Sequence, residues 1–273
     1  MPITVNSIAN SLIAQRTLNQ STSDLNSDFQ KLSSGKRING AQDDAAGLAI
    51  VEKLNSEING FSTAINNASS GIALSQTADG ALSNISEGVQ RIRDLSVQAA
   101  NGSLNDSDRE ALQREVVQLK DEISNQLENT HFNGQSLLNS SDSLAFQVGN
   151  GTGAQVNIDK QDVSALFASA GFDQIDISTA AGASSALTTL DTALDDVGQA
   201  RTQFGAAQGR FEATIQSLEQ NVVDSSRARS SIQDADFAAL IASKTKNDLL
   251  SQVGISLQAQ ANQNASSVLG LLA

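Results

Sequence analysis

Apolar residues near both ends of this 273-residue chain recur at spacings built from steps of three and four. Near the start they are Ile8, Leu18, Leu25, Phe29 and Leu32. Near the end they are Leu250, Val253, Leu257, Ala261, Val268 and Leu272. Because residues three and four apart lie on one helix face, this pattern predicts a helix at each end. Both apolar faces are narrow and rich in small residues, so each helix is expected to need a partner.

The first helix is predicted over residues 6–32, and Gly35 is expected to end it. Residues 36–42 form the predicted connector to a second helix. Asp43 and Asp44 are expected to supply the N-cap and a first-turn acid of that helix, since carboxylates there accept hydrogen bonds from unpaired backbone N–H groups.

The second helix is predicted to continue to Asn101, because its apolar residues keep the helical spacing and the only proline of the chain is Pro2. Ser107 is expected to begin the next helix, with Glu110 completing a capping box, and the helix is expected to end near Asn129.

Further along, helical spacing persists over eleven positions and predicts one long helix in a coiled-coil-like bundle. These positions are Leu187, Leu190, Leu194, Val197, Arg201, Phe204, Gln208, Phe211, Ile215, Leu218 and Val222. The two polar members, Arg201 and Gln208, either set the register of the bundle or lie at its rim. Residues 230–236 are expected to bend the path before the last helix.

Between these helices, residues 131–183 have a different pattern. Asn133-Gly134 is a tight-turn signal. Apolar and polar residues alternate over residues 144–148 and 156–158, on either side of a glycine-rich segment, which predicts a β-hairpin. Residues 161–183 are expected to form a short helix and then a strand at residues 175–177.

Together these elements predict a mainly α protein: an elongated helical rod whose ends lie side by side, with a small β-hairpin region at the tip. Residues 1–42 and 232–273 would form a terminal coiled-coil domain, and residues 43–231 a helical rod domain with a β-rich tip at about 131–183. Ordering the terminal helices costs much backbone entropy, whereas their few apolar residues return little in a single molecule. We therefore expect these helices to order cooperatively when copies of the chain cover their remaining faces.

Composition favours a structural role. The chain has nine Phe but no Trp and no Tyr, so it offers little material for an aromatic-lined pocket. A net charge of -13 disfavours binding to nucleic acid or to anionic membranes. No apolar run approaches the ~20 residues of a membrane span. No basic segment followed by an apolar run opens the chain, so no cleavable secretory signal is expected.

Catalytic, cofactor and metal sites are not predicted. The chain has no Cys, and His131 is its sole His, which leaves little basis for a metal site or a nucleophilic triad. The adjacent carboxylates at 43–44 and 195–196 diverge by about 100° around a helix, so neither pair converges on one substrate atom. The glycine-rich segment 149–153 lacks the lysine of a phosphate-binding loop, and a hairpin turn explains it better.

Several motifs in both halves of the chain resemble those of bacterial flagellin. They are LSSGKRIN at 32–39, DDAAGLAI at 43–50, QRIRDLSVQAANG at 90–102, FNG at 132–134, RTQFGAAQGRFE at 201–212, ARSSIQDAD at 228–236 and QANQNASSVLGLL at 260–272. The matching regions cover residues 1 to about 140 and about 185 to 273, in the order of the family.

This resemblance implies a structural subunit that polymerises into the extracellular flagellar filament for motility, with no catalysis and no cofactor. It implies a terminal coiled coil in the filament core and a helical rod around it, without the large outer domains of many flagellins. The residues expected to drive polymerisation are Ile8, Leu18, Leu25, Phe29, Leu32, Leu250, Val253, Leu257, Val268 and Leu272. The implied partners are copies of the chain, hook-junction and cap proteins, and a flagellar export chaperone.

Some flagellins are bound by a vertebrate flagellin receptor of the Toll-like class. The positions that match the family's receptor contacts are Arg91, Leu95, Gln98 and Glu115, while Val89 stands where the family usually has Leu. The same surface is also expected to form a contact between subunits. The alternative interpretation of Arg91 and Glu115 is a pair of charged residues at a subunit contact or on a solvated face.

Two other classes fit parts of the pattern. The hook–filament junction protein shares the terminal patterns in a weaker form, and the signalling hairpin of a chemoreceptor shares the richness in Ala, Ser and Gln. The block at residues 91–98 and the QANQ at 260–263 favour flagellin over the junction protein. A chemoreceptor hairpin should have two long arms around one tight tip and no β-hairpin.

Overall fold

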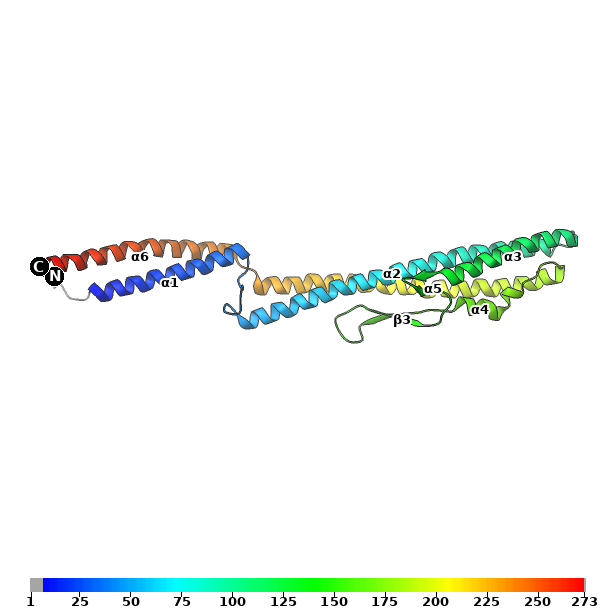
Figure 1. The fold of residues 1–273 in the computed structure, drawn as a ribbon, viewed down its shortest axis with the longest axis horizontal. Coiled ribbons are helices and arrows are strands. Elements are labelled where there is room, and N and C mark those ends of the chain that lie inside the picture. The colour runs from blue at the N-terminus through cyan, green and yellow to red at the C-terminus, as the bar shows by residue number, and fades with distance from the viewer. Residues whose placement is uncertain (1–6, 273) are drawn as a thin grey trace. The chain divides into compact units, whose positions relative to one another are not determined.

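The computed structural model describes the backbone of residues 7–272 and the side chains of residues 11–263. Its helices are α1 (Ser7–Ser34), α2 (Ala45–Ala99), α3 (Asp106–Asn129), α4 (Val163–Ala170), the short 3-10 helix η1 (Phe172–Gln174), α5 (Ala180–Gln233) and α6 (Phe237–Leu272). Its strands are β1 (His131–Phe132), β2 (Gln135–Ser136), β3 (Ser143–Gln147) and β4 (Gln155–Asp159). The predicted mainly α fold with a small β region is confirmed (Figure 1).

The chain divides into two compact units, one made of residues 1–57 and 224–273 and the other of residues 58–223. We name them the terminal unit and the central unit. The sequence-based division, with boundaries after residues 42 and 231, stays a prediction. It refers to domains of a subunit in a filament, whereas these two units are defined by packing within one chain.

In the terminal unit, α1 and α6 run antiparallel and lie side by side (Figure 1). Gly35 ends α1 with φ +69°, as its place after the last helical residue predicts. The backbone N–H of Ala235 donates to the carbonyl of Gly35 at 3.0 Å, and the N–H of Arg37 donates to the carbonyl of Gln233 at 2.6 Å. These bonds tie the α1–α2 connection to the α5–α6 connection. The helical path is interrupted there at residues 234–236, within the range predicted to bend.

The α1–α2 connection corrects one prediction. Asp44 does cap α2, because its Oδ1 accepts from the N–H of Gly47 at 2.8 Å. Asp43 does not join it in the first turn: its Oδ2 accepts from the N–H groups of Asn39, at 2.9 Å, and Gly40, at 3.2 Å. These hydrogen bonds close the connector on itself and lower the pKa of Asp43, with the bond from Asn39 as the largest cause.

The central unit has one continuous apolar core on α2, α3 and α5. The predicted heptad of α5 is confirmed by burial of its alternate positions, namely Leu190, Val197, Phe204, Phe211 and Leu218. α2 contributes Leu82, Ile85, Val89, Ile92 and Leu95, and α3 contributes Val116, Ile123 and Leu127. At Gly71 the helices approach closely: a Cβ there would lie 2.5 Å from Cζ of Phe211.

The beginning of α3 corrects a second prediction. Its N-cap is Asn105, whose side chain accepts from the N–H of Asp108, and not Ser107. Arg109 is 7% exposed and donates to the carbonyls of Ala99 and Asn101 at the end of α2. Its guanidinium satisfies carbonyls that the end of a helix leaves unpaired, so it fixes the α2–α3 turn.

The predicted turn at Asn133-Gly134 and the predicted hairpin are confirmed, since β1 pairs with β2 and β3 with β4, both antiparallel. The position of the second hairpin differs from the expected tip. Phe146 stacks edge-on against Phe211 of α5 at 5.4 Å, and Nδ2 of Asn67 of α2 donates to the carbonyl of Gln147. These contacts fall in the interiors of the long helices, so the hairpin lies along their flank and not beyond their ends (Figure 1).

The short helix predicted after the hairpin is α4, but the strand predicted at residues 175–177 is wrong. The backbone there bonds to side chains of α3 and not to a neighbouring strand. The N–H of Ile177 donates to Oε1 of Gln113 at 2.8 Å, and Nζ of Lys120 donates to the carbonyl of Asp173 at 2.6 Å. The apolar alternation at Ile175 and Ile177 reflects burial of both side chains in the core.

Candidate assembly interface

The contact between α1 and α6 contains buried polar groups. Asp28 and Asn247 are each 8% exposed, and Oδ2 of Asp28 accepts from Nδ2 of Asn247 at 3.0 Å and from Oγ of Ser243 at 2.9 Å. Nearer the other end of the contact, Nε2 of Gln258 donates to Oγ of Ser11 at 2.8 Å. We name the three residues Asp28, Ser243 and Asn247 the polar triad.

Of the predicted polymerisation residues on α1, the leucines Leu18, Leu25 and Leu32 are half-buried. Leu18 packs against Gly254 of α6, so this part of the stripe faces the intramolecular partner. Phe29 is 49% exposed, and Nζ of Lys244 lies 4.9 Å from its ring centroid. The side chain of Ile8 lies outside the described residues.

The predicted residues on α6 lie differently. Leu250, Val253 and Leu257 are 40%, 51% and 56% exposed, so they face away from α1. We name these three residues the outward stripe. The side chains of Val268 and Leu272 lie outside the described residues.

Sequence reasoning missed further exposed apolar side chains in the terminal unit. They are Leu12, Ile13, Ile50, Phe237, Ile241, Leu249 and Ile255. The predicted residues lie on one stripe per helix, whereas these large apolar residues lie off that stripe. A helix with apolar residues on several faces normally lies among several neighbours, and exposed apolar patches of this kind mark interaction surfaces.

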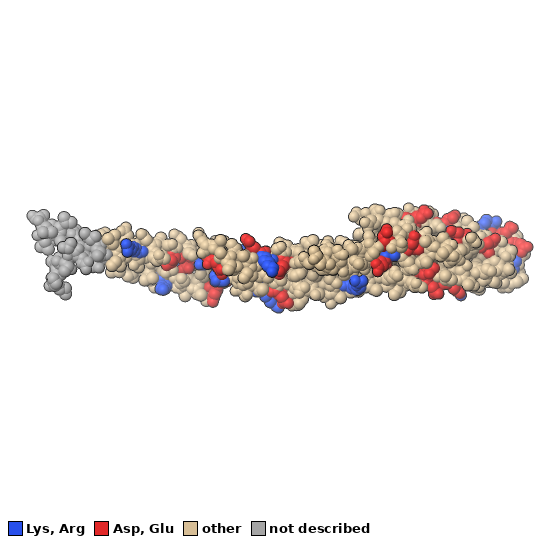
Figure 2. Space-filling model, turned by 90° about the horizontal axis from the view of Figure 1, so that it is seen from below, with Lys and Arg blue, Asp and Glu red and all other residues tan. Residues whose placement is uncertain are grey.

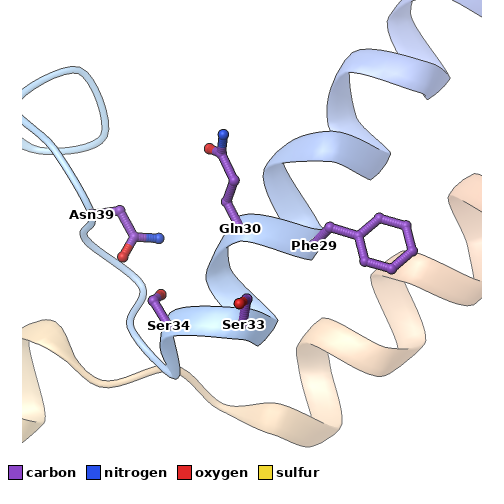
Figure 3. Close-up of a pocket in the computed structure, with 5 residues that line it drawn as sticks. All are labelled: Phe29, Gln30, Ser33, Ser34 and Asn39. Carbon is purple, nitrogen blue, oxygen red and sulfur yellow. The ribbon is translucent and has the colours of Figure 1, made fainter.

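A hollow of about 450 Å³ lies at the end of α1. Phe29, Gln30, Ser33 and Ser34 line it from the last turns of the helix, and Asn39 lines it from the connector (Figure 3). Only the ring of Phe29 gives it a large apolar wall, so it extends the exposed apolar surface of the terminal unit.

The second predicted contact surface lies on the central unit. Arg91 of α2 and Glu115 of α3 form an ion pair, with NH2 2.6 Å from Oε1, and both side chains remain substantially exposed. Gln98 is also exposed, and it lies two turns beyond Arg91 on the same face of α2. Leu95 is only 2% exposed and packs in the core, so it supports this surface from beneath.

Other candidate residues lie apart from these surfaces. Arg201 forms an ion pair with Asp79 at 2.8 Å and its side chain is 41% exposed, which places it at the rim of the bundle. Gln208 is half-buried and His131 is exposed. Burial, followed by the charge of Asp195, raises the pKa of Asp196.

Much of the surface displayed in Figure 2 carries no charged residue. Figure 2 shows broad stretches without charged residues, and Asp and Glu gather more densely over the end where α3 and α4 lie. Among the described residues, no group of His, Cys, Asp or Glu could hold a metal ion. No described helix is both long and apolar enough to cross a membrane.

Family models match both halves of the chain. The model of the bacterial flagellin N-terminal helical region matches residues 5–143, and that of the bacterial flagellin C-terminal helical region matches residues 187–272. The chain belongs to the bacterial flagellin family.

Individual flagellins agree over nearly the whole chain. A flagellin of Halalkalibacterium halodurans is 40% identical over 247 residues, covering 89% of this chain and 90% of that protein. A flagellin of Bacillus subtilis is 35% identical over 305 residues, covering 97% of this chain and 99% of that protein. The crystal structure of Bacillus cereus flagellin is similar with a TM-score of 0.52 and 31% identity, over 56% of this chain and 88% of that one.

Membership of this family makes the chain a structural subunit of the flagellar filament, which is an extracellular polymer of flagellin. Flagellins are filament proteins and not enzymes. The chain is therefore a self-assembling protein, and its α1 and α6 carry exposed apolar residues.

Proposed function

We propose that this flagellin assembles by coupled folding, in which α1 and α6 become rigid only when copies of the chain cover their outer faces. The observation that carries the proposal is the distribution of polar and apolar residues on the α1–α6 pair. Its internal contact contains the polar triad, whereas the outward stripe of Leu250, Val253 and Leu257 faces away. In water this leaves the apolar driving force for ordering largely unused until another subunit packs on the stripe.

The central unit has the opposite design. Its core buries large side chains of α2, α3 and α5, including Phe204 and Phe211, within one chain. We propose that it folds in the monomer and carries the terminal unit into the filament. The predicted terminal domain, residues 1–42 and 232–273, is the part that changes on assembly.

Hydrogen exchange of the dilute monomer and of the filament tests this proposal. Amides of α1 and α6 should exchange rapidly in the monomer and slowly in the filament, since only the polymer covers the outward stripe. Amides of α2 around Leu82–Val89 are the internal control and should be protected in both states. Slow exchange throughout α1 and α6 in the dilute monomer would contradict coupled folding.

We also propose that Arg91, Gln98 and Glu115 form a contact surface outside the terminal unit, first for a neighbouring subunit. The support is that all three are accessible on adjacent helices and that the ion pair holds two of them in place. The resemblance to receptor-binding flagellins makes the vertebrate Toll-like flagellin receptor a second proposed partner. Leu95 would position α2 beneath this surface.

The remaining proposed partners follow from the family resemblance. Hook-junction and cap proteins would meet the chain at the two ends of the filament. A flagellar export chaperone would cover the apolar residues of α6 before export, because these residues are exposed on the unassembled subunit. Export without a cleavable signal peptide is part of the same proposal.

A further inference from the structure

The leucines between α1 and α6 do not define how the two helices align. Leu18, Leu25 and Leu32 are spaced by seven residues. A slip of one heptad therefore places leucine where leucine was, and the apolar contacts change little. In coiled coils such a degeneracy is broken by a single buried polar position, which specifies the register.

The polar triad breaks this degeneracy. In the observed register the carboxylate of Asp28 accepts from Ser243 and Asn247, and burial makes these hydrogen bonds necessary. A slip of seven residues in one direction brings Asp28 opposite Leu250 and Gly254, and a slip in the other direction brings it opposite Asp236 and Leu240. None of these four residues has a side chain that donates a hydrogen bond to a carboxylate at neutral pH.

The triad also selects one face of α6. Rotating α6 to bring its outward stripe against α1 would turn Ser243 and Asn247 away from Asp28, so the carboxylate would lose both donors. In the observed pair, Lys31 and Lys244 form ion pairs with Asp43 and Asp248. Neither lysine is therefore available to pair with the carboxylate of Asp28 in the rotated arrangement.

We infer that Asp28, Ser243 and Asn247, together with the backbone bonds that join Gly35 to Ala235 and Arg37 to Gln233, fix the register and the face with which α1 and α6 pair, and thereby keep the outward stripe available to other subunits. The inference rests on the proposed function only for the use of that stripe. The alignment itself is a property of the single chain and is testable without a filament.

Disulfide trapping in the full-length chain tests the alignment, since the chain has no Cys of its own. A Cβ at position 254 lies 3.6 Å from Cβ of Leu18, which fits a disulfide. Leu18→Cys with Gly254→Cys therefore reports the observed register, and Leu25→Cys with Gly254→Cys reports a slip of one heptad. Each pair is oxidised at low protein concentration, and intrachain disulfides are quantified by peptide mass mapping.

Two backgrounds separate the triad from general packing. Asp28→Leu with Asn247→Leu removes the polar specification, so the share of the slipped disulfide should rise roughly tenfold. Asp28→Asn with Asn247→Asp exchanges the two groups and keeps a carboxylate–amide pair, so it should retain the parent ratio. An unchanged ratio in the leucine background, or a swapped background that slips like it, would overturn the inference.

Filament growth is scored separately on the same proteins without the cysteines. A parent chain that grows filaments while the leucine background keeps the parent disulfide ratio would overturn the register inference and leave the proposed function standing. A parent chain that grows no filaments would overturn the proposed function, and the disulfide ratio would still decide the register.

Discussion

Removing the outward stripe should weaken assembly without unfolding the central unit. The perturbation is the triple substitution Leu250→Ser, Val253→Ser and Leu257→Ser in the full-length chain. These side chains are 40%, 51% and 56% exposed in the single chain, so about half of each remains for a neighbouring subunit to bury.

The magnitude follows from this remaining area. Full burial of such a side chain contributes about 1.5–3 kcal/mol, so the buried half contributes roughly 1 kcal/mol and the three together roughly 3 kcal/mol per subunit. A factor of ten in an association constant corresponds to about 1.4 kcal/mol, so the critical concentration for elongation should rise roughly 100-fold.

The assay is seeded elongation. Fragments of parent filaments are mixed with monomer over a range of concentrations, and the polymer is measured by sedimentation and electron microscopy. The control variant is Ala238→Ser with Ala242→Ser and Ala259→Ser, which adds hydroxyl groups at exposed positions of α6 without removing a large apolar side chain. A triple stripe variant that elongates at the parent critical concentration would refute the reasoning.

Two further predictions concern the central unit. Gly71→Ala should destabilise the monomer to urea relative to Gly80→Ala by about 1–3 kcal/mol, because a Cβ at 71 meets Phe211 at 2.5 Å whereas one at 80 meets nothing within 4 Å. Equal midpoints for the two variants would show that the Gly71–Phe211 approach does not constrain the core. Arg91→Ala should change the unfolding free energy by less than about 1 kcal/mol, as expected of an exposed ion pair, yet reduce binding to the receptor ectodomain in surface plasmon resonance. Undiminished binding would remove Arg91 from the proposed receptor surface, and Arg114→Ala on the exposed part of α3 is the matched control.

The sequence predicted those elements whose burial follows a single helical face. α5 is the clearest case, because Leu190, Val197, Phe204 and Phe211 all point into one core and the period is undisturbed. The β3–β4 hairpin was predictable because burial alternates between the two faces of β4: Val156 and Ile158 are buried while their neighbours are exposed. Where one face decides burial, residue spacing is sufficient evidence.

Local capping was less predictable. Both Asn105 and Ser107 are suitable N-caps, and the choice between them depends on the α2–α3 turn that Arg109 holds from the inside. Asp43 likewise has the residue type of a helix acid but closes the connector instead. In each case a hydrogen bond outside the local pattern decided the outcome.

The orientation of α6 was beyond the reach of spacing alone. Its apolar residues occupy several faces, so the sequence could not show which face meets α1. The partners that decide it, Asp28 with Ser243 and Asn247, are more than two hundred residues apart in the chain. Their side chains are small and polar, so the spacing of apolar residues does not point to them.

The two interruptions of the helices, between α1 and α2 and between α5 and α6, are cross-linked by backbone bonds from Arg37 to Gln233 and from Ala235 to Gly35. A twist imposed on one chain path at this point must therefore be shared by the other. A force that enters through α1 or α6 can therefore pass to both covalent connections, and a hinge at either connection would have to break these backbone bonds. In a filament subunit, a double connection of this kind resists local bending at this point better than a single one would.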